Sequence, residues 1–288
     1  MTQNILVVGA DGTIGSALVN HLEQLGYSVY QTTRNNNSLN SRRFFLDLAE
    51  PASNWSLPTD VCITFICAAE TSTQLCAKNP QKTRLINVDR TEALAKQLSS
   101  LGSKIVFFST NQVFNGSCPY VKADEPINPQ TEYGRQKAGA EKRLLALGEK
   151  VTILRLTKVL SRKDKLLNQW KSSLQHNKII RPFSDMVLAP VSLVTVIELL
   201  VRLLTINVGG ILQISGNEDV TYEAVARHLA RQIGASPDLV QPTSLRESDP
   251  SLEYLPRHTT LDTSKVRRLL SIELPDVWFV LDQVLKET

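Results

Sequence analysis

The sequence predicts an α/β fold built on a doubly wound parallel sheet, with a smaller, partly interleaved C-terminal lobe. Three observations predict it: short β-rich runs alternate with amphipathic stretches, most of these runs are continuously apolar, and a glycine-rich turn follows the first of them. Parallel strands covered on both faces by helices carry such runs. The 288 residues, 42% of them hydrophobic, suffice for a core and fit about two domains.

The predicted strands of the first half are Asn4–Gly9, Ser28–Thr33, Arg43–Leu46, Val61–Cys67, Lys104–Ser109 and Val151–Leu156. Apolar residues recur at helical spacing between them, which predicts helices at Thr13–Leu25, Thr83–Leu101 and Glu132–Leu147. After Leu156 the alternation loosens into two helices and a short strand, at Leu193–Leu204, Tyr222–Ile233 and Gly210–Ile214. We therefore divide the chain into a sheet domain at 1–156 and a smaller lobe at 157–288.

Composition argues against several classes of protein. No apolar run approaches the roughly 20 residues that span a bilayer, and the N-terminus reads as a strand rather than a signal peptide, so we expect a cytoplasmic protein with no membrane partner. Four scattered cysteines and four histidines offer neither a disulfide framework nor metal-ligand spacing. The basic segment Lys150–Arg181 lacks a nucleic-acid motif, so it is either a solvated face or, with Arg257, a site for a diphosphate.

A glycine-rich turn joins the first predicted strand to the first helix, with the sequence Gly9-Ala-Asp-Gly12-Thr-Ile-Gly15. Gly9 permits a tight turn, Gly12 lets the backbone approach a pyrophosphate, and Gly15 lets helix and strand pack closely. The helix N-terminus offers free N–H groups and a partial positive charge to a phosphate. The turn predicts a Rossmann-type dinucleotide site that includes Gly9, Gly12, Thr13, Ile14 and Gly15.

The residues after the second predicted strand indicate which dinucleotide binds. NAD sites place an acid there for the ribose 2′-hydroxyl, whereas this sequence has Gln31-Thr-Thr-Arg34 and no acid. Arg34 would bind a 2′-phosphate as a bidentate cation, so NADP(H) is favoured over NAD(H). Further cofactor contacts are expected after the next two strands, from Asp47 and Leu48 at the adenine and from Ala68 and Ala69 at a ribose.

The segment Tyr133-Gly-Arg-Gln-Lys137 places a phenol and an amine on one face of a predicted helix, because residues four apart are neighbours there. A nearby ammonium favours the ionised phenol, so we expect Lys137 to lower the pKa of Tyr133 from about 10 and to make it a general acid/base. The preceding strand ends in Ser109-Thr110, which supplies a hydroxyl at the carboxyl edge of the sheet.

With the glycine turn, these residues resemble the extended short-chain dehydrogenase/reductases. Within that group the chain is similar to the dTDP-4-dehydrorhamnose reductase family, in the segments Phe108–Gly116, Pro119-Tyr120, Asp124–Pro126, Tyr133–Glu141, Ile86–Asp89, Leu154–Leu156, Gly210–Gly216 and Arg257–Asp262. The resemblance implies that Thr110, Tyr133 and Lys137 form the catalytic triad, with Lys137 also contacting the cofactor. It implies NADPH-dependent reduction of a keto group on a nucleotide-linked sugar.

The sugar stays open, because the family usually has Asp-Tyr after the catalytic threonine where this chain has Asn111-Gln112. These two residues and Arg257 are the expected substrate contacts. A 4,6-dehydratase is disfavoured, since its relatives carry Asp-Glu at the same place. Two alternatives remain: a nucleotide-sugar epimerase that retains NAD, and a non-catalytic NADP-binding regulatory subunit. The oligomeric state is open, a homodimer included.

Overall fold

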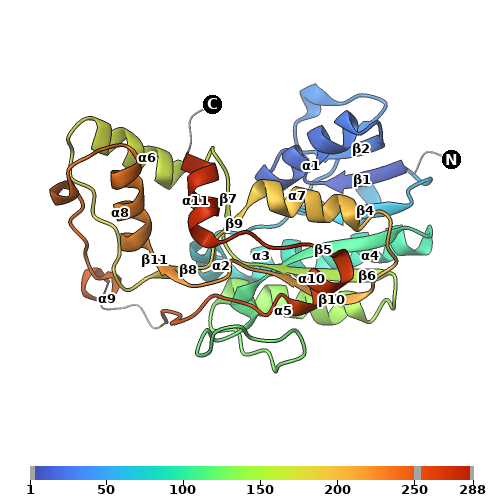
Figure 1. Cartoon of the computed structure of the whole chain (residues 1–288). Coiled ribbons are helices and arrows are strands. Elements are labelled where there is room, and N and C mark those ends of the chain that lie inside the picture. Colours follow the sequence, from blue (N-terminus) through green and yellow to red (C-terminus); the bar gives the residue numbers. More distant parts are fainter. Residues whose placement is uncertain (1–3, 250–253, 286–288) are drawn as a thin grey trace. The chain divides into compact units, whose positions relative to one another are not determined.

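The computed structural model describes residues 4–249 and 254–285, which form two compact units (Figure 1). Unit 1 comprises the described residues up to Phe114, Pro126–Leu156 and Ile197–Gln213. Unit 2 comprises Asn115–Glu125, Thr157–Val196 and the described residues from Ile214 onward. The chain passes from unit 1 to unit 2 after Leu156, where the sequence suggests a boundary. Two segments lie on the other side of that division: 115–125 belongs to unit 2, and 197–213 belongs to unit 1.

Unit 1 is built on a seven-stranded sheet with the strand order β10-β6-β5-β4-β1-β2-β3. The strands are β1 (Asn4–Val8), β2 (Ser28–Thr33), β3 (Arg43–Phe45), β4 (Ile63–Ile66), β5 (Lys104–Thr110), β6 (Val151–Leu156) and β10 (Gly210–Ile214). Strands β1 to β6 pair in parallel. The order reverses between β1 and β4, and ligands bind beyond the carboxyl ends of the strands at such a switch point. The predicted α/β fold is confirmed.

Helices cover both faces of this sheet. They are α1 (Thr13–Gln24), α2 (Thr73–Lys78), α3 (Pro80–Arg84), α4 (Thr91–Ser100) and α5 (Glu132–Leu145). In Figure 1, α1 lies above the strands and α5 below them. Leu6 and Val8 of β1 are fully buried in one cluster with residues of α4 and α5, such as Leu94 and Leu144. Alternate side chains of a strand point to opposite faces, which is why apolar runs without polar alternation mark these strands.

The helix predicted at Thr83–Leu101 is interrupted. Between α3 and α4 lies a π-helical segment, η3 (Leu85–Arg90). At its end the Thr91 hydroxyl donates to the carbonyl oxygen of Ile86 at 2.9 Å, five residues back. The side chain of Asn87, inside η3, bonds to residues outside the helix. A π-turn of this kind often marks a functional position.

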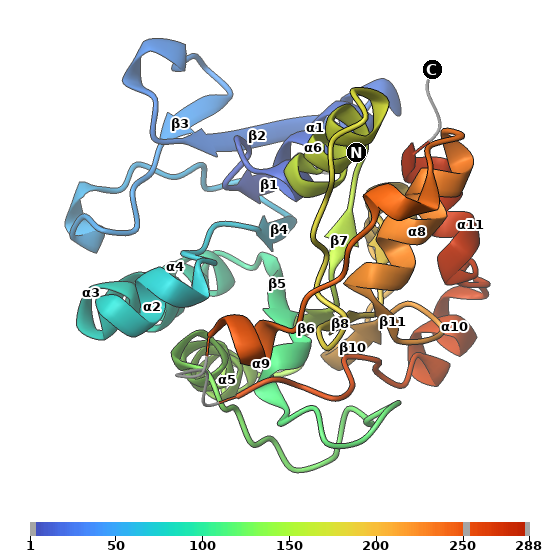
Figure 2. The same ribbon diagram turned by 90° about the vertical axis from the view of Figure 1, so that its left-hand side faces the viewer.

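Unit 2 has short strands and longer helices (Figure 2). Strand β7 (Val159–Leu160) pairs in parallel with β9 (Val191–Ser192), and β8 (Val187–Leu188) pairs antiparallel with β11 (Val220–Thr221). The helices that begin in unit 2 are α6 (Lys165–Gln175), α7 (Leu193–Arg202), α8 (Tyr222–Gln232), α9 (Leu245–Ser248), α10 (Ser264–Leu270) and α11 (Val277–Leu285). The core of the unit packs Trp170 and Leu174 with Leu229 and Leu281. Among the described residues, none of the helices has the length and apolar character that crossing a bilayer requires.

A buried ion pair ties α5 to the sheet. Glu141 accepts hydrogen bonds from Arg155 of β6, with Nη2–Oε2 at 2.8 Å, and from the Ser109 hydroxyl of β5 at 2.5 Å. The side chains of Arg155 and Glu141 are only 2% and 3% exposed. Arg155 belongs to the basic segment noted in the sequence, but its charge is buried inside unit 1 and paired with Glu141. Each member of such a pair is costly to leave alone, because an uncompensated charge then stays buried.

Replacing Arg155 with methionine should therefore lower the free energy of unfolding by about 3–5 kcal/mol. The matched control is Arg143→Met, since Arg143 of the same region pairs with Asp89 and Glu92 while remaining 35% exposed. Surface pairs contribute about 1 kcal/mol or less. Chemical denaturation of both variants measures the difference, and equal losses would show that the Glu141–Arg155 pair has no special role.

Candidate active site

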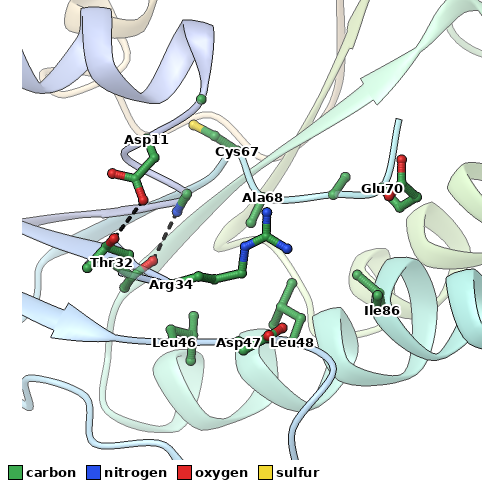
Figure 3. Close-up of a pocket in the computed structure, with 14 residues that line it drawn as sticks. Asp11, Thr32, Arg34, Leu46, Asp47, Leu48, Cys67, Ala68, Glu70 and Ile86 are labelled. Atoms are coloured by element: carbon green, nitrogen blue, oxygen red, sulfur yellow. Dashed lines mark hydrogen bonds between the residues drawn. The ribbon is translucent and has the colours of Figure 1, made fainter. Parts of the chain in front are cut away.

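A cleft of about 230 Å³ opens in unit 1 at the carboxyl ends of the strands around the switch point (Figure 3). Residues of the glycine turn, the ends of β2 and β4, the segment after β3 and the segment η3 surround it. They are Gly9, Asp11, Gly12, Thr32, Thr33, Arg34, Leu46, Asp47, Leu48, Cys67, Ala68, Ala69, Glu70 and Ile86.

The glycine turn is shaped so that only glycine fits at two positions. Gly9 has a φ of +83°, and a Cβ there would lie 2.8 Å from the backbone nitrogen of Ala68. A Cβ on Gly15 would lie 2.2 Å from the carbonyl oxygen of Gly9. The turn therefore lets α1 and β4 approach β1 with bare backbone, which is the cradle that a pyrophosphate requires.

Helix α1 begins beside this cradle. Its N-cap is Gly12, and no side chain caps its first turn. The first N–H groups of the helix thus remain available to an anion. Of the five turn residues predicted to bind the cofactor, Gly9 and Gly12 line the cleft, whereas Thr13 and Ile14 open the helix and Gly15 is buried beneath the turn.

The end of β2 differs from the expectation in one respect. Thr32 accepts a hydrogen bond from the Gly9 nitrogen through Oγ1 at 3.0 Å, which folds the glycine turn over the strand end. This brings the Asp11 carboxylate to Thr33, whose Oγ1 donates to Oδ2 at 2.6 Å. The sequence shows no acid after β2, but the turn supplies one. Asp11 and the exposed Arg34 line the same cleft, and Figure 3 shows the Arg34 side chain extending into it.

Four further predicted cofactor residues line the cleft, on the segments after β3 and β4, whereas the predicted contact Lys137 does not. Asp47 is half-buried, and its Oδ1 accepts from the Ala49 nitrogen at 2.9 Å, which fixes the turn after β3. Leu48 is buried beside it. Ala68 and Ala69 follow β4, and their small side chains leave the backbone open to the cleft.

Asn87 holds that backbone in place, and sequence reasoning did not assign it a role. Its side-chain amide accepts from the Glu70 nitrogen at 2.8 Å and donates to the Glu70 carbonyl at 2.9 Å. It also donates to Gln136 Oε1 at 2.9 Å. Asn87 thus links the loop after β4 to helix α5 at Gln136, the residue that precedes Lys137. The only sequence signal was its place in the motif Ile86–Asp89.

Thr110, Tyr133 and Lys137 belong to β5 and to α5, which is packed against it. The Lys137 ammonium lies 3.8 Å from the centre of the Phe107 ring. At the start of the helix, a Cβ on Gly134 would lie 2.3 Å from the Gln112 carbonyl oxygen, just beyond Thr110. These contacts set the first two turns of α5 against the end of β5. Within the described chain, the Tyr133 hydroxyl and the Lys137 amine form no hydrogen bond or ion pair. Both residues are buried, and they do not line the cleft described above.

The protonation of the two groups differs from the sequence expectation. Burial raises the pKa of Tyr133, with a smaller contribution from Cys76, and the expected lowering by Lys137 is not found. Burial lowers the pKa of Lys137 to about 7, against the attraction of Glu141 and Cys67. The physical reason is that both groups leave water, which disfavours the phenolate and the ammonium alike. The phenol is therefore protonated at neutral pH.

The predicted substrate residues occupy different surroundings. Gln112 accepts from the Thr131 hydroxyl through Oε1 at 3.0 Å, and Thr131 is the N-cap of α5, so Gln112 helps to fix the start of that helix. Asn111 is half-buried beside Thr110. Arg257 lies in unit 2 with an exposed side chain, and its backbone nitrogen donates to Gly116 at 3.1 Å. Its role as a substrate contact stays a prediction.

The depressed pKa of Lys137 predicts a pH-dependent stability. Between about pH 7 and pH 10, the unfolded chain holds a proton on this amine that the folded chain does not, so the free energy of unfolding rises with pH in that window. Relative to Lys137→Met, the wild type should gain roughly 1 kcal/mol per pH unit. Urea denaturation at pH 7, 8 and 9 measures this gain, with the exposed Lys142→Met as the control. A constant difference between wild type and Lys137→Met would contradict the buried, depressed amine.

Comparison with known proteins adds an independent observation. The family model described as "RmlD substrate binding domain" matches residues 3–288. The chain is 26% identical over 280 residues to the probable low-salt glycan biosynthesis reductase Agl14 of Haloferax volcanii, with 93% of each chain covered. It is 25% identical over 310 residues to the dTDP-4-dehydrorhamnose reductase of Escherichia coli K12, with 99% of this chain and 97% of that one covered. The crystal structure of dTDP-4-dehydrorhamnose reductase from Bacillus anthracis in complex with NADP matches the fold with a TM-score of 0.83 and 17% identity, over 99% of this chain and 98% of that one.

Proposed function

The chain belongs to the family of the RmlD substrate binding domain, and on this premise we propose that it reduces a keto group on a nucleotide-linked sugar, using a nicotinamide dinucleotide. One observation carries the proposal: a protonated phenol and a buried amine, both without a hydrogen-bond or ion-pair partner in the described chain, lie on one helix packed against the strand that ends at Thr110. When bound, the dinucleotide supplies the hydride that the ketone accepts.

The residues divide the remaining work. Gly9, Gly12 and the first turn of α1 would hold the pyrophosphate. Tyr133 delivers a proton to the oxygen that becomes an alkoxide, and Thr110 orients the carbonyl through a hydrogen bond. Lys137 would hold the nicotinamide ribose and, when protonated, would favour release of the phenolic proton.

The protonated phenol of Tyr133 and the similarity to dTDP-4-dehydrorhamnose reductases both support a reductase. A reduction consumes a proton from the catalytic acid, and burial keeps the phenol in the form that donates. A non-catalytic subunit has no need of a phenol and an amine on one helix that are both free of hydrogen bonds and ion pairs within the described chain. We infer that NADPH is preferred over NADH, on the strength of the Arg34 guanidinium in the cleft.

Tyr133→Phe should lower kcat by roughly 10²–10⁴-fold, because the ring and its packing remain while the general acid is lost. The assay follows oxidation of NADPH in the presence of nucleotide-linked 4-keto sugars. The affinity for NADPH and the melting temperature should stay at wild-type values. The control is Tyr222→Phe, which removes a phenol from α8 in unit 2. Full activity in Tyr133→Phe would overturn the mechanism and favour the regulatory subunit.

Arg34→Gln tests the cofactor preference. The guanidinium would contact a 2′-phosphate but has no partner on NADH, so the variant should bind NADPH about tenfold more weakly and NADH almost as well as before. Isothermal titration calorimetry with each dinucleotide measures both dissociation constants. Wild-type protein that binds NADH as tightly as NADPH would refute the preference.

A further inference from the structure

One carboxylate joins three elements at the edge of the cleft. Asp11, in the glycine turn, accepts from Thr33 of β2 at 2.6 Å through Oδ2. Its Oδ1 forms an ion pair with Nη2 of Arg43, the first residue of β3. The Asp11 side chain is 51% exposed and lines the cleft, and Figure 3 shows it at the strand end from which Arg34 extends.

This position is where a Rossmann-type site distinguishes its dinucleotides. An acid there accepts from a free ribose 2′-hydroxyl, and a cation there binds a 2′-phosphate. Thr33 carries no charge for either task, and its hydroxyl proton is given to Asp11 while its oxygen accepts from the Asn35 nitrogen at 2.9 Å. Asp11 therefore stands in for the acid that β2 lacks, at the same place as the cation Arg34.

The negative charge of Asp11 repels a 2′-phosphate and the positive charge of Arg34 attracts it. The charge of Arg43, which pairs with Asp11, therefore decides the net charge at this position. Asp11 contributes one negative charge, and Arg34 and Arg43 contribute one positive charge each, which leaves a net charge of about +1 at physiological pH. Arg43 is held by Asp11, its Nε is buried without a hydrogen-bond partner in the described chain, and its side chain is 28% exposed. Arg34 makes no ion pair with the described residues. A carboxylate that accepts one bond on each oxygen keeps further lone pairs for a ribose hydroxyl.

We propose that the Asp11–Arg43 ion pair sets the cofactor preference of this site. Arg43 neutralises Asp11, so the charge of Arg34 prevails and a 2′-phosphate is accepted. The same carboxylate retains free lone pairs for an unphosphorylated ribose. NADH therefore also binds, though more weakly than NADPH, and the preference for NADPH is modest. This inference rests on the proposed function, because it requires a dinucleotide in the cleft.

The test is a charge cycle measured by binding. Asp11→Asn raises the net charge at the site to +2, Arg43→Gln lowers it to 0, and the double variant Asp11→Asn/Arg43→Gln restores +1. The dissociation constants of NADPH and NADH are measured by calorimetry at low salt, without substrate. Neither Arg42 nor Arg43 lines the cleft itself, and Arg43 acts there through its ion pair with Asp11. The matched control is therefore Arg42→Gln, the same change in the neighbouring residue, which is exposed and does not pair with Asp11 in the described chain.

Arg43→Gln should weaken NADPH binding about tenfold relative to NADH, and Asp11→Asn should shift the ratio a similar amount toward NADPH, as expected for one screened charge near a phosphate. The double variant should return to the wild-type ratio, and Arg42→Gln should leave it unchanged. The inference would be overturned if Arg43→Gln and Arg42→Gln changed the ratio of the two dissociation constants equally. It would also be overturned if the ratio in the double variant departed from the wild-type value as far as it does in the single variants.

The failure of this inference differs from the failure of the proposed function. Wild-type protein that binds neither dinucleotide would remove the premise itself. Wild-type protein that binds both, with single variants that change the two affinities in parallel, would leave the dinucleotide site intact and refute only the role of the pair. Arg43→Gln leaves the Asp11 carboxylate without its partner, and this variant could fail to fold when checked by circular dichroism. Asp11→Asn and the double variant have no carboxylate at residue 11, so the ratio of NADPH to NADH affinity in these two variants still tests the inference.

Discussion

The carboxylate of Glu141 connects three elements. It belongs to helix α5, and it accepts hydrogen bonds from Ser109 of β5 and from Arg155 of β6. Because its partners are buried, the position of α5 over the sheet is fixed with little tolerance, and this position also sets where the proposed catalytic groups on that helix lie. Tyr133 and Lys137 lie two turns and one turn before Glu141 on the same helix. Ser109 directly precedes Thr110, so the ion pair also holds the strand end that supplies the third group.

Burial at this junction has a chemical consequence. The same exclusion of water that makes the ion pair costly to break raises the pKa of Tyr133 and lowers the pKa of Lys137 to about 7. A phenol that remains protonated is suited to give a proton, and an amine that titrates near neutrality can change charge when a ligand alters its surroundings. Cation contact with Phe107 compensates part of the desolvation of Lys137 when it is protonated.

The cleft beside the glycine turn depends on a second set of constraints, which are contacts made with the backbone. Gly9 and Gly15 leave no space for side chains, and Thr32 holds the turn against β2. Asn87 fixes the opposite wall through the backbone of Glu70. These contacts come from α1, β2, β4 and η3, so the cleft is formed by segments that are distant in sequence and adjacent only because the parallel sheet reverses its order between β1 and β4.

The sequence by itself determined the α/β fold, most strand positions, the glycine turn and the Tyr-x3-Lys pair, because these depend on local periodicity and on residues within one or two turns of each other. Tertiary structure decided what depends on long-range contact. It buried Arg155, which the sequence grouped with a basic surface, and it interrupted the helix predicted at Thr83–Leu101 with a π-turn that places Asn87. It also brought Asp11 to the end of β2, 22 residues from Thr33, where the local sequence has no acid. The pKa of Tyr133 was mispredicted for the same reason: spacing shows which groups share a helix face, whereas burial, set by the packing of the whole unit, decides which protonation state is stable.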